Sequence, residues 1–215
     1  MKKVAVIDYG MGNLHSVHKA LIKVGAQEVI LTDKPDELMA AERIIFPGVG
    51  ALRDCVNAMK SRGLDEMLRE YVKNKPVMGI CLGMQALFDY SEENEGTDGF
   101  GFLKGKVRHF QRSDDMPMMK IPHMGWNEVH QSVKHPMWQG IAQDSRFYFV
   151  HSYYVDNDQA DVVSGETDYG VKFTSAVAMG NLFAVQFHPE KSQAAGLKLL
   201  ANFLTWTGSD NERSR

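Results

Sequence analysis

The first half of the chain alternates short apolar runs with amphipathic segments. Apolar runs of strand length occupy residues 3–8, 28–31, 43–46 and 77–81, and apolar positions with helical spacing occupy residues 13–24, 36–41 and 51–60. Asn13 stands where a helix N-cap is expected, and Gly25 ends the first helix. Near-continuous apolar strands that alternate with helices predict a parallel sheet with helices on both faces. In such a sheet, ligands bind at the carboxyl ends of the strands.

The second half of the chain departs from this alternation. Residues 100–110 predict an antiparallel ribbon, and strands are expected at 146–150, 161–166, 173–179 and 182–187, the last two joined by a hairpin turn at Gly180-Asn181. Residues 114–126 are rich in methionine and predict an ordered excursion, in which the methionines fill the core in preference to forming a contact surface. A helix over 193–206 closes the fold. The predicted class is α/β, with a mostly parallel central sheet flanked by helices on both faces and an added antiparallel ribbon.

Length and composition favour one domain. The chain has 215 residues, of which 44% are hydrophobic, and we expect residues 1–207 to form a single domain and residues 208–215 a disordered tail. The formal net charge of -3 offers no basic stripe for nucleic acid. Signal-peptide and membrane-spanning patterns are missing, which predicts a cytoplasmic protein. Cys55 and Cys81 are the only cysteines, which argues against a disulfide framework and fits a reducing compartment.

Cys81 stands at the carboxyl end of the fourth apolar run, between Gly79 and Gly83. With a helix predicted over residues 84–90, this is the strand, turn and helix of a nucleophile elbow, with cysteine in place of serine. Amides at the helix N-terminus would favour the reactive thiolate. The alternative is a buried structural cysteine between packing glycines. Cys55, within a predicted helix, is expected only to pack.

Two glycine-containing loops follow predicted strands. Residues 8–15 resemble the opening of a dinucleotide-binding fingerprint, but His15 replaces the third glycine, so we predict no cofactor. This loop is either a tight turn or a surface that meets a partner. In the second loop, residues 47–50, backbone amides could supply one donor of an oxyanion hole, with the amide of Leu82 as the other. A plain strand-to-helix turn explains that loop equally well.

His188 and Glu190 flank Pro189 after the last predicted strand. Extended geometry before a proline would place both side chains on one side, where the carboxylate can orient the imidazole. Alone, the pair could be a surface ion pair. Together with Cys81 and the glycine loop, it fits a site for nucleophilic acyl transfer. The other histidines form no ligand set with the cysteines, so we predict no metal.

Several stretches carry a family resemblance. Residues 79–85 and 186–190 resemble the triad-type, class I glutamine amidotransferases, which have a flavodoxin-like fold. The loops between them are similar to the family of glutaminase subunits of imidazole glycerol phosphate synthase, of histidine biosynthesis. The similarity covers residues 4–203 and is carried by Asp8-Tyr9-Gly10-Met11-Gly12-Asn13-Leu14, Pro47-Gly48-Val49-Gly50, Pro122-His123-Met124-Gly125-Trp126-Asn127, Val150-His151-Ser152-Tyr153 and His188-Pro189-Glu190-Lys191-Ser192.

The resemblance implies catalytic roles for three residues. Cys81 would attack the side-chain amide of glutamine, His188 would protonate the leaving ammonia and then activate water, and Glu190 would orient His188. The oxyanion would be held by the amide of Leu82 and, after rearrangement of the glycine loop, by that of Val49 or Gly50.

The resemblance also implies which residues hold the glutamine. Its amino and carboxylate ends would be held by Gln85, by Glu93 and by the backbone of His151, Ser152 and Tyr153. The neighbouring Glu92 leaves the assignment of Glu93 open between the two acidic residues. Gln85 could instead be an ordinary first-turn helix residue, and the acidic pair a solvated loop.

A partner is implied as well, because free ammonia would be protonated and lost in water. By resemblance, the partner is the cyclase subunit, a (β/α)8 barrel that uses ammonia to form imidazole glycerol phosphate and an aminoimidazole carboxamide ribotide. The candidates for the docking face are Met11, Asn13, Trp126 and Lys191, which could also be ordinary surface or turn residues. Three alternatives remain: an amidotransferase for another acceptor such as a surface-polysaccharide sugar, a stand-alone γ-glutamyl cysteine hydrolase, and a flavodoxin-like binding module without activity.

Overall fold

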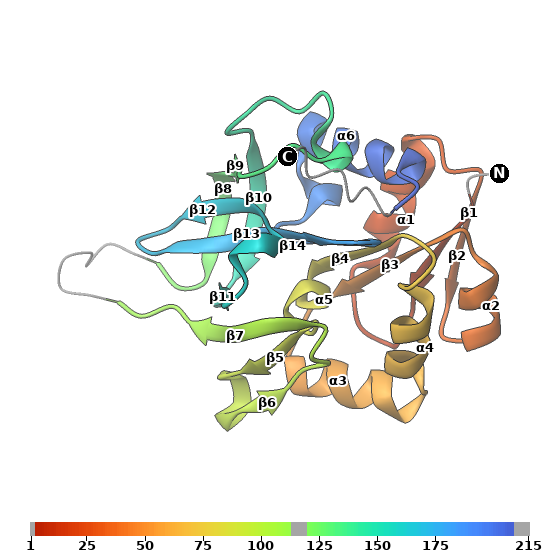
Figure 1. Ribbon diagram of the computed structural model, residues 1–215, viewed down its shortest axis with the longest axis horizontal. Helices are drawn as coiled ribbons and strands as arrows, with labels where there is room; N and C mark the ends of the chain where they lie inside the picture. Colours follow the sequence, from red (N-terminus) through yellow and green to blue (C-terminus); the bar gives the residue numbers. More distant parts are fainter. Residues whose placement is uncertain (1–2, 113–119, 209–215) are drawn as a thin grey trace.

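The computed structural model describes residues 3–112 and 120–208. Its centre is a sheet in which five neighbouring strands run parallel (Figure 1). In spatial order they are β2 (Glu28–Thr32), β1 (Lys3–Ile7), β3 (Arg43–Gly48), β4 (Val77–Cys81) and β14 (Leu182–Val185). The predicted α/β class with a parallel central sheet is confirmed.

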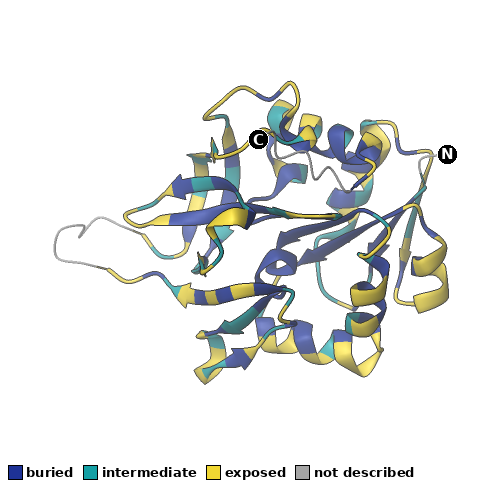
Figure 2. Cartoon of the chain, viewed as in Figure 1, coloured by how far each residue is buried: buried dark blue, intermediate teal, exposed yellow. Residues whose placement is uncertain are grey.

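Helices cover both faces of these strands, as predicted (Figure 1). One face carries α1 (Leu14–Lys23) and α6 (Gln193–Thr205), and the other carries α2 (Pro35–Ala40), α3 (Leu52–Ser61) and α4 (Leu64–Tyr71). Side chains alternate between the faces along each strand, so Val4 and Val6 of β1 join one hydrophobic core while Ala5 and Ile7 join the other. The central strands β3, β4 and β14 are buried throughout, whereas β2 at the edge of the sheet is partly exposed (Figure 2).

Antiparallel strands extend the sheet beyond β14. They follow in the order β13 (Lys172–Met179), β11 (Tyr153–Asn157) and β7 (Leu103–His109), after which β5 (Phe88–Ser91) pairs in parallel and β6 (Thr97–Asp98) ends the sheet. Off this path, β12 (Val163–Asp168) pairs with β13 and with β9 (His130–Gln131), and β8 (His123–Glu128) pairs with β10 (Arg146–His151) as a separate ribbon. The hairpin turn at Gly180-Asn181 is confirmed by the pairing of Met179 with Leu182.

The prediction of a helix over residues 84–90 is wrong. The helix after Cys81 is a single turn, α5 (Leu82–Gln85), and β5 follows it. The amides of Phe100 and Leu103 donate to the carbonyls of Ala86 and Leu87, which a longer helix would need for its own hydrogen bonds. Tertiary pairing therefore replaces the local helical preference.

Other differences concern a missing helix and the start of a strand. The helix α4 was not predicted. The strand β12 begins at Val163 because a 3-10 turn, η3 (Ala160–Val162), precedes it. Asn13 occupies the cap position of α1, but its side chain makes no capping hydrogen bond. Residues 114–119 of the predicted excursion lie outside the described residues. The strand β8 begins near the far end of the excursion, and Met124 in this strand is 61% exposed. The prediction that the methionines fill the core is therefore wrong for Met124.

Of the predicted tail, only Gly208 lies within the described residues. Across the described residues, no helix is long and apolar enough to cross a membrane.

Candidate active site

The turn after β4 holds Cys81 in a strained backbone conformation. Its φ of 55° and ψ of -110° are sparsely populated by residues other than glycine. A Cβ on Gly83 would overlap the backbone oxygen of Phe46, and one on Gly79 would lie 2.9 Å from the Cβ of Ala184. Both glycines are therefore required by close packing, and the predicted elbow is confirmed. The helix α5 has a single turn, so it contributes little helix dipole. A negative charge on Cys81 would therefore be favoured mainly by the adjacent backbone amides.

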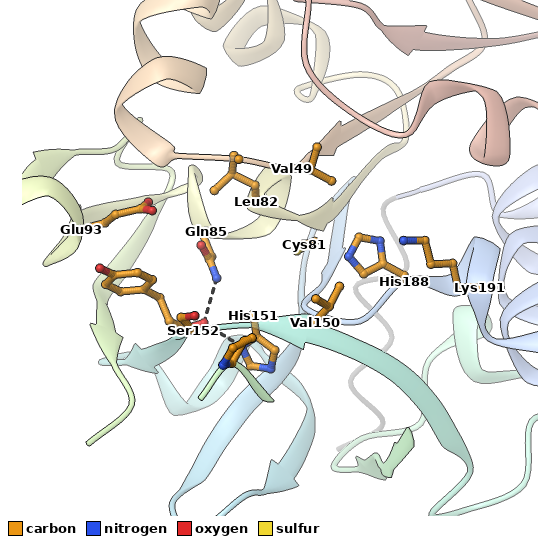
Figure 3. Close-up of a pocket in the computed structure, with 13 residues that line it drawn as sticks. Val49, Cys81, Leu82, Gln85, Glu93, Val150, His151, Ser152, His188 and Lys191 are labelled. Atoms are coloured by element: carbon orange, nitrogen blue, oxygen red, sulfur yellow. Dashed lines mark hydrogen bonds between the residues drawn. The ribbon is translucent and has the colours of Figure 1, made fainter. Parts of the chain in front are cut away.

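A cavity of about 400 Å³ opens beside Cys81 (Figure 3). This volume suits a ligand of amino-acid size. Most of the residues singled out from the sequence meet there. The lining consists of Val49, Gly50, Cys81, Leu82, Gln85, Glu93, Pro122, Val150, His151, Ser152, Tyr153, His188 and Lys191. Of these, Pro122 and Val150 carried no predicted role.

His188 and Glu190 form a buried pair behind this cavity. Nδ1 of His188 lies 2.8 Å from Oε1 of Glu190, and the two side chains are 2% and 1% exposed. The pairing was predicted, but the reason given for it was wrong. Glu190 lies in a 3-10 turn, η4 (Pro189–Lys191), and this turn brings the carboxylate back toward the ring of His188.

The charge state of His188 reflects opposing influences. Burial lowers its pKa, but a negative charge on the neighbouring Cys81 and the hydrogen bond to Glu190 outweigh burial and raise the pKa to about 10. At neutral pH the ring is therefore an imidazolium beside the sulfur. It can act as a general acid toward a leaving group in the cavity.

We expect Cys81→Ala to lower the pKa of His188. The substitution removes the negative charge that opposes burial, so the neutral ring is favoured more strongly. Histidine ¹⁵N chemical shifts, followed by NMR as a function of pH, measure this change. Cys55→Ala serves as the control and should leave the titration of His188 where it is. An identical titration in Cys81→Ala and in the wild-type protein would contradict the assigned ion pair.

Gln186 belongs to the site and was missed as a functional residue. Its Nε2 donates to Sγ of Cys81 at 3.6 Å, and its Oε1 accepts from Nε2 of Gln85 at 2.9 Å. Gln85 Nε2 also donates to the carbonyl of Tyr153 at 3.0 Å, so both amide hydrogens of Gln85 are used. The contact depends on tertiary pairing: β14 pairs in parallel with β4, and the register of Val185 with Ile80 sets the next residues, Gln186 and Cys81, side by side.

The fold places the neighbouring residues Glu92 and Glu93 in different surroundings. Oε2 of Glu93 accepts from the amide of Leu52 at 2.8 Å, and Glu93 lines the cavity. Glu92 lies outside this lining, where its Oε2 accepts from the amide of His109. Of the two residues, Glu93 is the one that can face a ligand in the cavity.

The glycine loop lies beside the nucleophile because β3 and β4 are neighbours. Gly48 pairs directly with Cys81, and Val49 and Gly50 follow at the cavity. The buried Tyr9 hydroxyl donates to the carbonyl of Pro47 at 3.1 Å and so fixes the start of this loop. Burial raises the pKa of Tyr9, which keeps the hydroxyl protonated as a donor. No motif in the sequence indicates this contact.

Of the four residues proposed for a docking face, one lines the cavity and three lie outside its lining. Lys191 lines the cavity, and its Nζ lies 6.0 Å from the ring centre of Tyr148. The ring of Trp126 lies 6.2 Å from the same ring. The sulfur of Met11 lies 3.8 Å from where a Cβ on Gly50 would be. Asn13 immediately precedes α1, outside the lining of the cavity.

Cys55 does not reach the cavity that Cys81 lines. It is fully buried in α3, and burial raises its pKa to about 12. Among residues 3–112 and 120–208, no three histidine, cysteine or carboxylate side chains are placed to bind a metal ion.

Comparison with known proteins identifies the family. The model of the class-I glutamine amidotransferases matches residues 5–206. The chain belongs to the class-I glutamine amidotransferase family. The amidotransferase is 54% identical to the imidazole glycerol phosphate synthase subunit HisH of Acinetobacter baylyi, over 96% of this chain and 99% of that protein. It is 52% identical to the subunit HisH of Nitrosomonas europaea, over 96% of this chain and all of that protein.

Solved structures show the same fold. The amidotransferase superposes on a chain of the PurLQS structure from Thermotoga maritima with a TM-score of 0.71, covering 94% of this chain and 97% of that one. The two chains are 20% identical, so this likeness concerns the fold alone.

Proposed function

We propose that this chain is the glutaminase subunit of an imidazole glycerol phosphate synthase. It hydrolyses glutamine to glutamate and ammonia and delivers the ammonia to a cyclase subunit, which forms imidazole glycerol phosphate and an aminoimidazole carboxamide ribotide in histidine biosynthesis. The observation that carries the proposal is the 54% identity to a HisH subunit over nearly the full length of both chains. The cavity that joins Cys81 with His188 supports it from the chemical side.

In the first half of the reaction, the thiolate of Cys81 attacks the side-chain amide carbon of glutamine. A carbon–sulfur bond forms, and the carbonyl oxygen takes up the negative charge. His188 then donates its proton to the amide nitrogen, the carbon–nitrogen bond breaks and ammonia leaves. The product is a γ-glutamyl thioester on Cys81, and His188 is left neutral.

In the second half, His188 accepts a proton from a water molecule that attacks the thioester carbon. The carbon–sulfur bond breaks, glutamate leaves, and the thiolate and imidazolium are restored. Glu190 keeps Nδ1 of His188 protonated, so that Nε2 faces the reacting groups.

Backbone amides stabilise the charge on the oxygen. The amide of Leu82 is one donor, and that of Val49 or Gly50 is the other after the glycine loop rearranges. The ends of the glutamine are held by Gln85, by Glu93 and by the backbone of His151, Ser152 and Tyr153, all of which line the cavity.

Ammonia must pass to its acceptor without crossing solvent, where it would be protonated. We therefore propose that the cyclase barrel docks over the mouth of the cavity and contacts Met11, Asn13, Trp126 and Lys191. Residues 1–207 would act as one amidotransferase domain. The cytoplasm is the proposed compartment, because Cys81 must stay reduced to react.

Reconstitution with the cyclase subunit and its nucleotide substrate tests this function. We expect glutamine to support formation of imidazole glycerol phosphate, with one glutamate released for each product molecule. If ammonium salts support the cyclase and glutamine does not, the proposal is wrong. Equal glutamine hydrolysis with and without the cyclase would instead favour a stand-alone hydrolase.

A further inference from the structure

Two buried histidines lie behind the cavity, and the mechanism above uses neither imidazole. His151 is the last residue of β10, His123 is the first residue of β8, and the two pair directly in antiparallel register. Their exposed fractions are 6% and 3%. Nδ1 of His123 lies 2.9 Å from Nε2 of His151, which makes a direct hydrogen bond between the rings.

Both rings are neutral. Burial lowers the pKa of His151 to about 3 and that of His123 to about 4. At physiological pH each ring therefore has one nitrogen that carries a hydrogen and one that accepts. Neighbouring groups decide which nitrogen is which.

The position of the hydrogen on each ring can be assigned by starting from the Tyr153 carbonyl at the cavity. The carbonyl of Tyr153 can only accept, and it lies 2.7 Å from Nδ1 of His151. Nδ1 of His151 therefore carries the hydrogen, and its Nε2 must accept. The donor to that Nε2 is the Nδ1–H of His123.

The opposite end of the pair gives the same assignment. The amide of Glu128 donates to Oδ1 of Asn127 at 2.8 Å, and Nδ2 of Asn127 donates to the carbonyl of Asp168 at 2.8 Å. The same Nδ2 lies 3.4 Å from Nε2 of His123, which is therefore the accepting nitrogen. Along the path from Asn127 through His123 and His151 to the carbonyl of Tyr153, each hydrogen-bond donor thus faces an acceptor.

Stacking fixes the plane of the His123 ring. Its centroid lies 3.8 Å from that of Tyr169 with 19° between the planes, and 4.8 Å from that of Phe149 with 20° between the planes. The ring of His123 is thus held in the orientation that points Nδ1 at His151.

The hydrogen bonds continue from this pair to the nucleophile. The carbonyl of Tyr153 accepts from Gln85 as well as from His151, and Gln85 donates in turn to Gln186. Gln186 donates to the sulfur of Cys81. His123 is therefore connected, through polar groups that are nearly all buried, to the wall of the cavity and to its reactive atom.

We propose that His123 is a positioning residue of this active site: its Nδ1–H holds the imidazole of His151, which in turn fixes the Tyr153 carbonyl at the wall of the glutamine pocket. Both nitrogens of His151 are engaged in these bonds, so His151 does not transfer protons in the reaction. The inference rests on the proposed function, because it assigns the backbone of residues 151–153 to glutamine binding.

Two variants of His123 separate its hydrogen bond from its stacking. His123→Phe keeps an aromatic ring but loses the donor, whereas His123→Asn keeps an amide donor near the place of Nδ1 but loses the ring. In the complex with the cyclase, we expect His123→Phe to raise KM for glutamine about tenfold, since it leaves a buried acceptor unpaired. Its kcat should change less than about threefold, and KM of His123→Asn should stay within about threefold of the wild-type value.

NMR of the free chain provides a readout that a purely structural role would not move. The ¹⁵N shifts of His151 should show a protonated Nδ1 and an Nε2 that accepts a hydrogen bond in the wild-type protein. In His123→Phe, Nδ1 should stay protonated, while the Nε2 shift should move to that of a nitrogen without a donor. An unchanged Nε2 shift with unchanged KM would overturn the inference. An equal rise in KM for His123→Phe and His123→Asn would also overturn it, since stacking would then be the cause. Failure of the wild-type complex to hydrolyse glutamine would reject the proposed function, while the Nε2 shift of His151 still decides the role of His123.

Discussion

Cys81→Ala is expected to abolish glutamine-dependent product formation, with a loss of more than about 10³-fold, because no other group in the cavity can form the thioester. The cyclase reaction driven by ammonium salts should keep its wild-type rate in the same complex. The measurement is imidazole glycerol phosphate formed from each nitrogen source at saturating nucleotide.

Cys55→Ala is the matched control for this experiment. Cys55 is fully buried and away from the cavity, so its substitution should leave the glutamine reaction within about twofold of wild type, once the folded fraction is equal. Residual glutamine-dependent activity in Cys81→Ala would show that another group is the nucleophile. Loss of the ammonia reaction as well would point to damage to the complex.

Gly83→Ala is expected to destabilise the fold by about 3 kcal/mol, because the added Cβ would overlap the backbone oxygen of Phe46 in the neighbouring strand. For a chain of this size, that corresponds to a fall in Tm of roughly 10 °C. The turn that presents Cys81 must shift to make room, so glutamine hydrolysis should fall with stability. Calorimetry and glutaminase assays of the complex measure the two effects.

Gly180→Ala is the control for the Gly83 variant. Gly180 has a φ of 57° in the hairpin turn, but a Cβ there meets no atom within 4 Å. We expect a cost of about 1 kcal/mol from the backbone conformation alone and no loss of glutaminase activity. If both variants had the same Tm, the close contact with Phe46 would not contribute to the loss of stability in Gly83→Ala.

The parallel half of the fold could be predicted because its central strands are buried on both faces and therefore appear as continuous apolar runs. That pattern located β1, β3 and β4, and the glycines around Cys81 located the elbow. The helix α4, which was not predicted, also has apolar residues with helical spacing, because Leu64, Met67, Leu68 and Tyr71 share its buried face. The strand β5 could not be separated from a helix by its apolar pattern, since it also pairs with β7, where Leu103 lies opposite Phe88 and 15 residues along the chain.

The candidate site was predictable where one local segment determines the geometry and unpredictable where tertiary contacts do. His188 and Glu190 lie two residues apart, so their pairing was accessible from the sequence. The choice of Glu93 over Glu92 depends on the amide of Leu52, 41 residues away. The contact between His123 and His151 depends on the antiparallel register of β8 with β10, which no short motif encodes.

The contrast between the two thiols has a practical consequence. Cys55 is sealed within the core with a pKa near 12, whereas Cys81 opens onto a cavity beside an imidazolium. A thiol-directed fluorophore or spin label will therefore attach at a single native position. The unaltered chain can thus report from its own reaction centre as the partner docks.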